Sequence, residues 1–170
     1  YNALAAIAVA RFFGISWGEI DTALSRLQVT RMRTEVVKTK RSFTVINDAY
    51  NASPTSMRAA LTLLGELDGY RKKIAVLGDM LELGDKEAAF HQEIGEMLRP
   101  EKVDYVFTYG PLARLIAAAA APFFGQGRVK AFNDKAALAE AVLSVASSDD
   151  IVLLKASRGM RLEELLDYWV

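Results

Sequence analysis

Polar residues that are able to bind a ligand follow five short apolar segments of this sequence. They include carboxylates, amides, hydroxyls and cations: Asp48, Tyr50 and Asn51 after the first segment, Gly78 and Asp79 after the second, Tyr109 and Gly110 after the third, Asn133 and Asp134 after the fourth, and Lys155, Ser157 and Arg158 after the fifth. Parallel strands end at the same edge of a sheet, and α/β proteins bind their ligands beyond that edge. Any one of these residues is better explained as a turn or cap residue, but that explanation is weaker for the whole set. The pattern therefore predicts a ligand site where the segments end.

The usual motifs for binding a triphosphate are absent from the sequence. Neither a G-x-x-x-x-G-K-[S/T] loop nor a G-x-G-x-x-G loop occurs, so any ATP chemistry needs phosphate-binding parts from elsewhere. No metal site is predicted, because the sequence has no cysteine and a single histidine. That residue, His91, falls within a predicted helix, where we expect it to pack or to cap locally.

The short apolar segments alternate with longer segments that have helical periodicity. This alternation of strands and helices is typical of an α/β fold. Strands are predicted at 43–47, 73–77, 103–108, 129–132 and 151–154, and helices at 54–67, 86–98, 112–120, 134–146 and 161–169. Short apolar strands separated by helices of this length indicate a parallel sheet that is covered on both faces. The predicted fold class is α/β, with a doubly wound, mainly parallel sheet.

The first thirty residues differ from this pattern. Residues 2–13 form an Ala-rich helical run that is apolar nearly all round, so we expect other protein to cover it. Ser16 and Glu19 form a capping box for a second, short helix. Residues 31–41 are basic and alternating, which predicts a strand. The expected division is therefore 1–30, the helical end of another domain, and 31–170, an α/β domain.

Composition excludes several classes of function. The formal net charge is zero, so neither nucleic acid nor an anionic membrane is an expected partner. No apolar run reaches the roughly 18 residues that a membrane-spanning helix needs, and residues 1–14 lack the basic start and cleavage pattern of a secretion signal. The sequence predicts a cytoplasmic protein.

Several segments resemble the Mur ligase family, in particular those members that add D-alanyl-D-alanine. The resemblance covers essentially the whole chain, and its main motifs are Asn2–Ala6, Met32–Glu35, Ile46–Met57, Val76–Gly84, His91 with Gly95, and Leu154–Met160. It implies a Rossmann-like carboxyl-terminal ligase domain, preceded by the end of a central ATPase domain.

The same resemblance implies ATP-dependent amide formation. In that reaction a UDP-N-acetylmuramoyl-tripeptide carboxylate attacks the γ-phosphate of ATP, and the amine of D-alanyl-D-alanine displaces phosphate from the resulting acyl phosphate. The family binds ATP and Mg²⁺ mainly through its central domain, so we expect these residues alone to be inactive. The protein is expected to be a monomer.

The resemblance also assigns residues to the nucleotide. Asn2 matches the residue that contacts the adenine, Arg33 the arginine that reaches ATP, and Asp48 the aspartate that holds the ribose. An arginine offers a planar fork of donors to phosphate, and a carboxylate accepts hydrogen bonds from ribose hydroxyls. Asn51 follows on the same loop and is expected to orient the nucleotide or the incoming dipeptide.

Three further residues are expected at the dipeptide. Lys155 and Ser157 are the candidates for its carboxylate and its amide, since an ammonium suits a carboxylate and a hydroxyl bonds an amide. Asp79 either binds the amino group of the dipeptide or braces a loop, and the sequence does not separate these roles.

Two alternatives from other classes remain open at this point. A signalling receiver domain also has an early aspartate, a hydroxyl after one strand and a lysine after the last, as with Asp48, Thr108 and Lys155. It also needs an acid at the end of the third strand, where residues 107–110 contain none. The other alternative is a nucleotide-binding module without catalysis, which would bind ATP tightly by itself.

Overall fold

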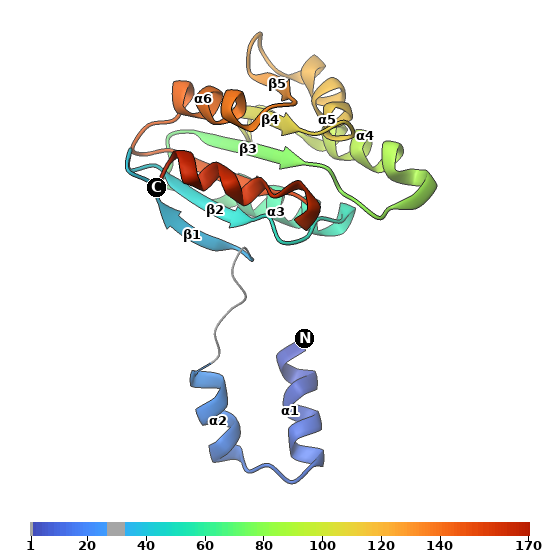
Figure 1. Cartoon of the computed structure of the whole chain (residues 1–170), viewed down its shortest axis with the longest axis vertical. Coiled ribbons are helices and arrows are strands. Elements are labelled where there is room, and N and C mark those ends of the chain that lie inside the picture. Colours follow the sequence, from blue (N-terminus) through green and yellow to red (C-terminus); the bar gives the residue numbers. More distant parts are fainter. Residues whose placement is uncertain (1, 27–32) are drawn as a thin grey trace. The chain divides into compact units, whose positions relative to one another are not determined.

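The computed structural model describes residues 2–26 and 33–170 of the chain (Figure 1). Its internal contacts divide the chain into two units, Tyr1–Thr30 and Arg31–Val170. Each unit is described separately below.

The first unit contains two helices, α1 (Asn2–Phe12) and α2 (Trp17–Ser25). Gly14, at φ 80°, lets the chain turn after α1. The side chain of Ser16 accepts from the backbone N–H of Glu19, and the Glu19 carboxylate accepts from the backbone N–H of Ser16. This is the predicted capping box. Many large apolar side chains of the unit are exposed: Leu4, Val9, Phe12, Phe13, Ile15, Trp17 and Leu24.

The second unit is a six-stranded sheet with the order β1-β2-β6-β3-β4-β5. Its strands are β1 (Glu35–Lys38), β2 (Thr44–Asp48), β3 (Lys73–Gly78), β4 (Tyr105–Tyr109), β5 (Val129–Phe132) and β6 (Ile151–Lys155). Edge strand β1 is antiparallel to β2, and every other pairing is parallel. The predicted mainly parallel α/β fold is confirmed.

Helices cover both faces of this sheet (Figure 1). They are α3 (Pro54–Glu66), α4 (Glu87–Met97), α5 (Ala113–Ala120) and α6 (Lys135–Val145), with short 3-10 helices η1 (Gly84–Lys86), η2 (Ala121–Phe123), η3 (Arg158–Met160) and η4 (Leu162–Tyr168). Side chains of α3, α4 and α5 pack on one face of the sheet, and those of α6 and η4 pack on the other.

The sheet supplies both cores because its strands are apolar on both sides. In β3, Ala75 and Leu77 belong to the core under α3, α4 and α5, whereas Ile74 and Val76 belong to the core under α6 and η4. This alternation follows from the two-residue period of a strand. It explains why β3 is a continuous apolar run in the sequence.

Capping residues begin two helices of this unit, and its last element differs from the sequence-based prediction. Ser53 caps α3 with Pro54 in its first turn, and Asp134 caps α6. The last segment, however, was predicted as an ordinary helix and is the 3-10 helix η4. Leu162 and Leu165 are both buried, and a 3-10 helix places residues three apart on one face, which a regular α-helix does less well.

Candidate functional site

The topology of the sheet creates a crevice beside the carboxyl end of β6. The chain leaves β2 and β3 toward helices on one face, but it leaves β6 toward η4 on the opposite face. Loops that depart to opposite faces cannot fill the space between the strand ends, and ligands of such sheets bind there. The site is therefore positioned by the loops that follow β2, β3 and β6.

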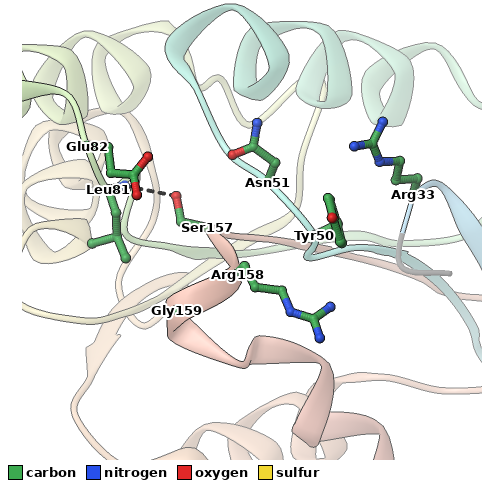
Figure 2. Close-up of a pocket in the computed structure, with 8 residues that line it drawn as sticks. All are labelled: Arg33, Tyr50, Asn51, Leu81, Glu82, Ser157, Arg158 and Gly159. Carbon is green, nitrogen blue, oxygen red and sulfur yellow. Dashed lines mark hydrogen bonds between the residues drawn. The ribbon is translucent and has the colours of Figure 1, made fainter. Parts of the chain in front are cut away.

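A pocket of about 480 Å³ lies at this point. We call it the loop pocket, and it is lined by Arg33, Tyr50, Asn51, Leu81, Glu82, Ser157, Arg158 and Gly159. Figure 2 shows the lining residues, with Leu81 and Glu82 on one side, Arg33 and Tyr50 on the other, and Ser157 and Asn51 between them. The pocket combines cationic, anionic and neutral hydrogen-bonding groups.

Two arginines share the ring of Tyr50. The guanidinium carbon of Arg33 lies 4.7 Å from the ring centroid, and that of Arg158 lies 5.5 Å from it. An arginine that stacks on an aromatic ring loses little of its capacity to bind anions, because its donors point outward in the ring plane. The loop pocket thus has a cationic side that is built around Tyr50.

A second, smaller pocket of about 300 Å³ adjoins the loop pocket. We call it the Asp48 pocket, and it is lined by Arg33, Thr34, Asp48, Asn51, Ser56 and Lys155. Arg33 and Asn51 line both pockets. A ligand in one pocket would consequently lie next to a ligand in the other, with these two side chains between them.

Lys155 is the buried centre of the Asp48 pocket, with 1% of its surface exposed. Its Nζ donates to Oδ2 of Asp48 at 2.6 Å and to the backbone carbonyl of Asn51 at 3.0 Å. Asp48 and Lys155 are register partners at the ends of β2 and β6. Oδ1 of Asp48 accepts from the backbone N–H of Thr34 at 3.2 Å. The ion pair therefore connects two strand ends, the loop after β2, and the segment that carries Arg33.

Ser157 is also buried, and it connects the three loops of the site. Its Oγ accepts from the N–H of Leu81 at 2.9 Å and lies 3.4 Å from the carbonyl of Ala52, to which it donates. Its own N–H donates to the carbonyl of Asp79 at 3.0 Å. The hydroxyl thus holds the loop after β3 against the loops after β2 and β6.

Asp79 and His91 fix the loop after β3 from its other side. Oδ1 of Asp79 accepts from the N–H groups of Leu112 and Ala113 at the start of α5, at 3.1 and 2.6 Å. Burial raises the pKa of Asp79, although these N–H bonds work in the opposite direction. Nε2 of His91 accepts from the N–H of Met80 at 2.9 Å, which leaves Nδ1 to donate to the carbonyl of Glu87 at 2.6 Å.

Gly110 makes this arrangement possible. It has φ 117°, and a Cβ at this position would collide with the Asp79 carboxylate and with Met160. Only glycine lets the start of α5 approach the carboxylate so closely.

The sequence-predicted site residues fall into three groups. Arg33 and Asn51 line both pockets, and Asp48 lines the smaller one. Lys155 lines the Asp48 pocket and Ser157 lines the loop pocket, but both are buried, with 1% and 6% exposure, as is Asp79 with 2%. The polar atoms of all three bond to neighbouring loops. Asn2 lies in α1, within the other unit, and its side chain is outside the described residues. Arg33 precedes β1 instead of lying within it, as the predicted strand 31–41 had implied.

Five residues that line the loop pocket have no role predicted from the sequence, namely Tyr50, Leu81, Glu82, Arg158 and Gly159. Tyr50 and Arg158 were visible as residues at strand ends. Glu82 carried no such signal, because it lies four residues beyond β3 and its position depends on bonds made by Met80 and Leu81.

Two features were searched for and not found among the described residues. Within residues 2–26 and 33–170, no three or more His, Asp or Glu side chains are grouped so that they could hold a metal ion. No helix in the same part of the chain is long and apolar enough to cross a membrane.

The fold is that of an α/β domain with a pocket at a topological switch point of its sheet. Residues 32–158 match the family model described as Mur ligase, glutamate ligase domain. The match spans most of the sequence, and the chain belongs to the Mur ligase family. The resemblance noted in the sequence is confirmed, and the receiver-domain alternative is not supported.

Curated relatives and solved structures agree with this membership. The chain is 52% identical, over 97% of its length, to the UDP-N-acetylmuramoyl-tripeptide–D-alanyl-D-alanine ligase of Bacillus subtilis, and 31% identical, also over 97%, to the ligase of the same name from Escherichia coli. The chain superposes on a crystal structure of MurF from Acinetobacter baumannii with a TM-score of 0.81 and 30% identity. The superposition covers 98% of this chain and 36% of the MurF chain. A MurF ligase of Thermotoga maritima in complex with ADP gives a TM-score of 0.73 at 30% identity, covering 96% of this chain and 35% of that one. The chain spans 36% and 35% of the lengths of the two curated relatives.

Proposed function

We propose that the protein to which these residues belong is an ATP-dependent ligase that joins D-alanyl-D-alanine to UDP-N-acetylmuramoyl-tripeptide. The observation that carries this proposal is the 52% identity to the Bacillus subtilis ligase over nearly the whole chain. Ligases of the same name recur among the other relatives at 28–36% identity. The proposed setting is the cytoplasmic synthesis of peptidoglycan precursors, by a monomer.

The Asp48 pocket is the proposed site for the ribose of ATP and part of its phosphates. Asp48 supplies an acceptor for ribose hydroxyls, and Arg33 supplies donors for phosphate oxygens. Asn51 would contact the nucleotide at the junction of the two pockets, and Asn2 would contact the adenine. In this scheme Lys155 acts on the nucleotide indirectly, because its ammonium holds Asp48 and the Asn51 carbonyl in place.

The loop pocket is the proposed site for the incoming dipeptide. Ser157 and Asp79 would act there by holding the loop after β3 in position, since their polar atoms are already bonded to backbone groups. Mg²⁺ and the triphosphate would be bound mainly outside this chain, because its described residues offer no metal-binding group of three acidic or histidine side chains. The residues of this chain thus position substrates and stabilise charge, while the phosphate-binding elements come from elsewhere in the protein.

Phosphate release by the full-length protein tests the proposal. With ATP, Mg²⁺ and UDP-N-acetylmuramoyl-tripeptide present, we expect release to depend on added D-alanyl-D-alanine. Single amino acids, added in place of the dipeptide, are the control. Release that needs a single amino acid would move the protein to another step within the family, and no release with any amine would favour a binding module without catalysis.

A further inference from the structure

The ring of Tyr50 contacts arginines from two different parts of the chain. Arg33 precedes β1, and Arg158 begins η3 after β6. The guanidinium carbon of Arg33 lies 4.7 Å from the ring centroid, and that of Arg158 lies 5.5 Å from it. Figure 2 shows Tyr50 between the two guanidinium groups. Both arginines are exposed, so the ring is a surface that restrains otherwise solvated side chains.

The backbone holds Tyr50 in a fixed position. The preceding residue, Ala49, is fully buried. The carbonyl of the following residue, Asn51, accepts from Nζ of Lys155 at 3.0 Å, and the same ammonium donates to Asp48 at 2.6 Å. Bonds on both sides of Tyr50 therefore anchor this loop to the end of β6, and the half-buried ring offers a rigid surface.

An aromatic ring reduces the free energy needed to order an exposed arginine. A free arginine side chain samples many rotamers, and ordering it when an anion binds costs conformational entropy. Two guanidinium groups in one pocket also repel each other. The negative face of a ring attracts a guanidinium group and restrains it, while its N–H donors stay available for an anion. The ring of Tyr50 therefore favours the placement of both cations before a ligand arrives.

We propose that Tyr50 is a positioning residue whose ring orders the guanidinium groups of Arg33 and Arg158 before the phosphates of ATP arrive. The proposal rests on the proposed ligase function, in which Arg33 binds phosphate oxygens. Arg158 would add a second positive charge nearby. Tyr50 belongs to neither of the two cores that the described residues form, so core packing does not explain why this position is aromatic. Tyr50 would thus act on turnover through the arginines.

Steady-state kinetics of the full-length protein tests this role. Tyr50→Leu removes the ring and should lower kcat about tenfold, because the contact with the guanidinium groups is lost. The KM for the UDP-linked tripeptide should change by less than about twofold. Tyr50→Phe keeps the ring and should retain kcat within about twofold of the parent value. An unchanged kcat in Tyr50→Leu, or an equal loss in Tyr50→Phe, would overturn the proposal.

Tyr105→Leu is the matched control. Tyr105 is also half-buried, and the guanidinium carbon of Arg128 lies 6.0 Å from the centroid of its ring. It lines neither the loop pocket nor the Asp48 pocket, so Tyr105→Leu should leave kcat within about twofold of the parent value. A loss of kcat in this variant equal to that in Tyr50→Leu would contradict a role specific to Tyr50.

Two further measurements separate positioning from folding. In an Arg33→Ala background, Tyr50→Leu should lower kcat by less than about twofold, because the side chain that it positions is gone. A further loss of about tenfold there would refute the proposal. Pentafluorophenylalanine in place of Tyr50 keeps the shape of a phenyl ring but reverses the polarity of its face. Its kcat should fall about tenfold below that of Tyr50→Phe at a similar Tm, and an equal kcat would also refute the proposal.

The parent protein distinguishes a failure at Tyr50 from a failure of the proposed function. If the parent itself shows no phosphate release that depends on the dipeptide, the ligase function is wrong. If the parent is active and the Tyr50 variants behave differently from these expectations, only the positioning role is wrong.

Discussion

At the scale of single residues, Lys155 illustrates how burial changes an assignment. From the sequence alone, Lys155 is a lysine at a strand end and a candidate to bind the dipeptide carboxylate. In the structure, its ammonium lies beneath the surface and bonds to Asp48 and to the carbonyl of Asn51. A buried cation with these partners cannot leave them without exposing an unpaired charge. Its proposed effect on catalysis is therefore indirect, through the proposed nucleotide-binding residues Asp48 and Asn51.

A double-mutant cycle tests this positioning role. Lys155→Met should raise the KM for ATP by about tenfold, and more than it raises the KM for the dipeptide, because Asp48 loses its partner. Asp48→Asn should have a similar effect. The double variant should be little worse than either single variant, with a coupling of about 1 kcal/mol or more. Additive effects would contradict the coupling, and a rise confined to the dipeptide would restore the direct role that the sequence suggested.

Arg33 carries a second prediction at this scale. Arg33 lines both pockets, and we propose that it binds phosphate oxygens of ATP. In that position its guanidinium would stabilise negative charge that develops on the transferred phosphate. Arg33→Ala should lower kcat of the full-length protein about 100-fold and leave the affinity for the UDP-linked tripeptide nearly unchanged. Arg128→Ala is the control, because Arg128 also lies over a tyrosine ring but lines neither pocket. Unchanged turnover in Arg33→Ala would remove this role.

At the scale of elements, the amino ends of β3 and β6 are joined by a buried carboxylate. Asp150 accepts from the N–H and the hydroxyl of Ser147, both at 2.8 Å, and from Nε of Arg71 at 3.3 Å, with Nζ of Lys72 3.6 Å away. Burial alone would raise the pKa of Asp150, but the bonds from Arg71 and Ser147 outweigh it and lower the pKa. This cluster lies at the edge of the sheet opposite the site and should affect stability alone.

The lowered pKa of Asp150 predicts how its contribution depends on pH. The unfolded carboxyl titrates near pH 4, so the stabilisation is fully present above that pH and is lost as the pH falls through the lower folded pKa. Asp150→Asn should cost about 1–3 kcal/mol at pH 7, and this difference should shrink as the pH approaches 3. Denaturant unfolding at both pH values measures it, with the exposed neighbour Asp149→Asn as control. A difference that stays constant with pH would contradict the assignment.

Most elements were predictable from the sequence because their signals are local. The periodicity of the apolar residues predicts the strands, and the capping box of Ser16 and Glu19 predicts the start of α2. The 3-10 character of η4 was not predictable, because it depends on how Leu162 and Leu165 meet the sheet. The order of the strands in the sheet was not predictable from the sequence either. The last strand, β6, lies between β2 and β3, and this placement depends on contacts between residues that are distant in the sequence.

The candidate site was also predictable from the sequence only in part. Strand-end polar residues marked the correct region, but the sequence did not distinguish side chains that face a ligand from those that hold loops. Ser157 and Arg158 are adjacent, yet Ser157 is buried in bonds to other loops and Arg158 is exposed in the loop pocket. Burial alone separates them, and it requires the three-dimensional structure.

At the scale of the whole molecule, the described residues supply two adjoining pockets. The Asp48 pocket and the loop pocket, which has both cationic and anionic lining residues, share Arg33 and Asn51. The described residues provide neither a triphosphate loop in the sequence nor a metal-binding cluster in the described structure. This division is consistent with a chain that spans about a third of the length of its curated relatives.

Identification of the product tests the central claim most directly. The full-length protein is incubated with UDP-N-acetylmuramoyl-tripeptide, D-alanyl-D-alanine, ATP and Mg²⁺, and the mass of the nucleotide-linked peptide is measured. The account predicts a UDP-N-acetylmuramoyl-pentapeptide, formed in equal amount with ADP and phosphate. ADP and phosphate without any extended peptide, or extension by a single amino acid instead of the dipeptide, would contradict it.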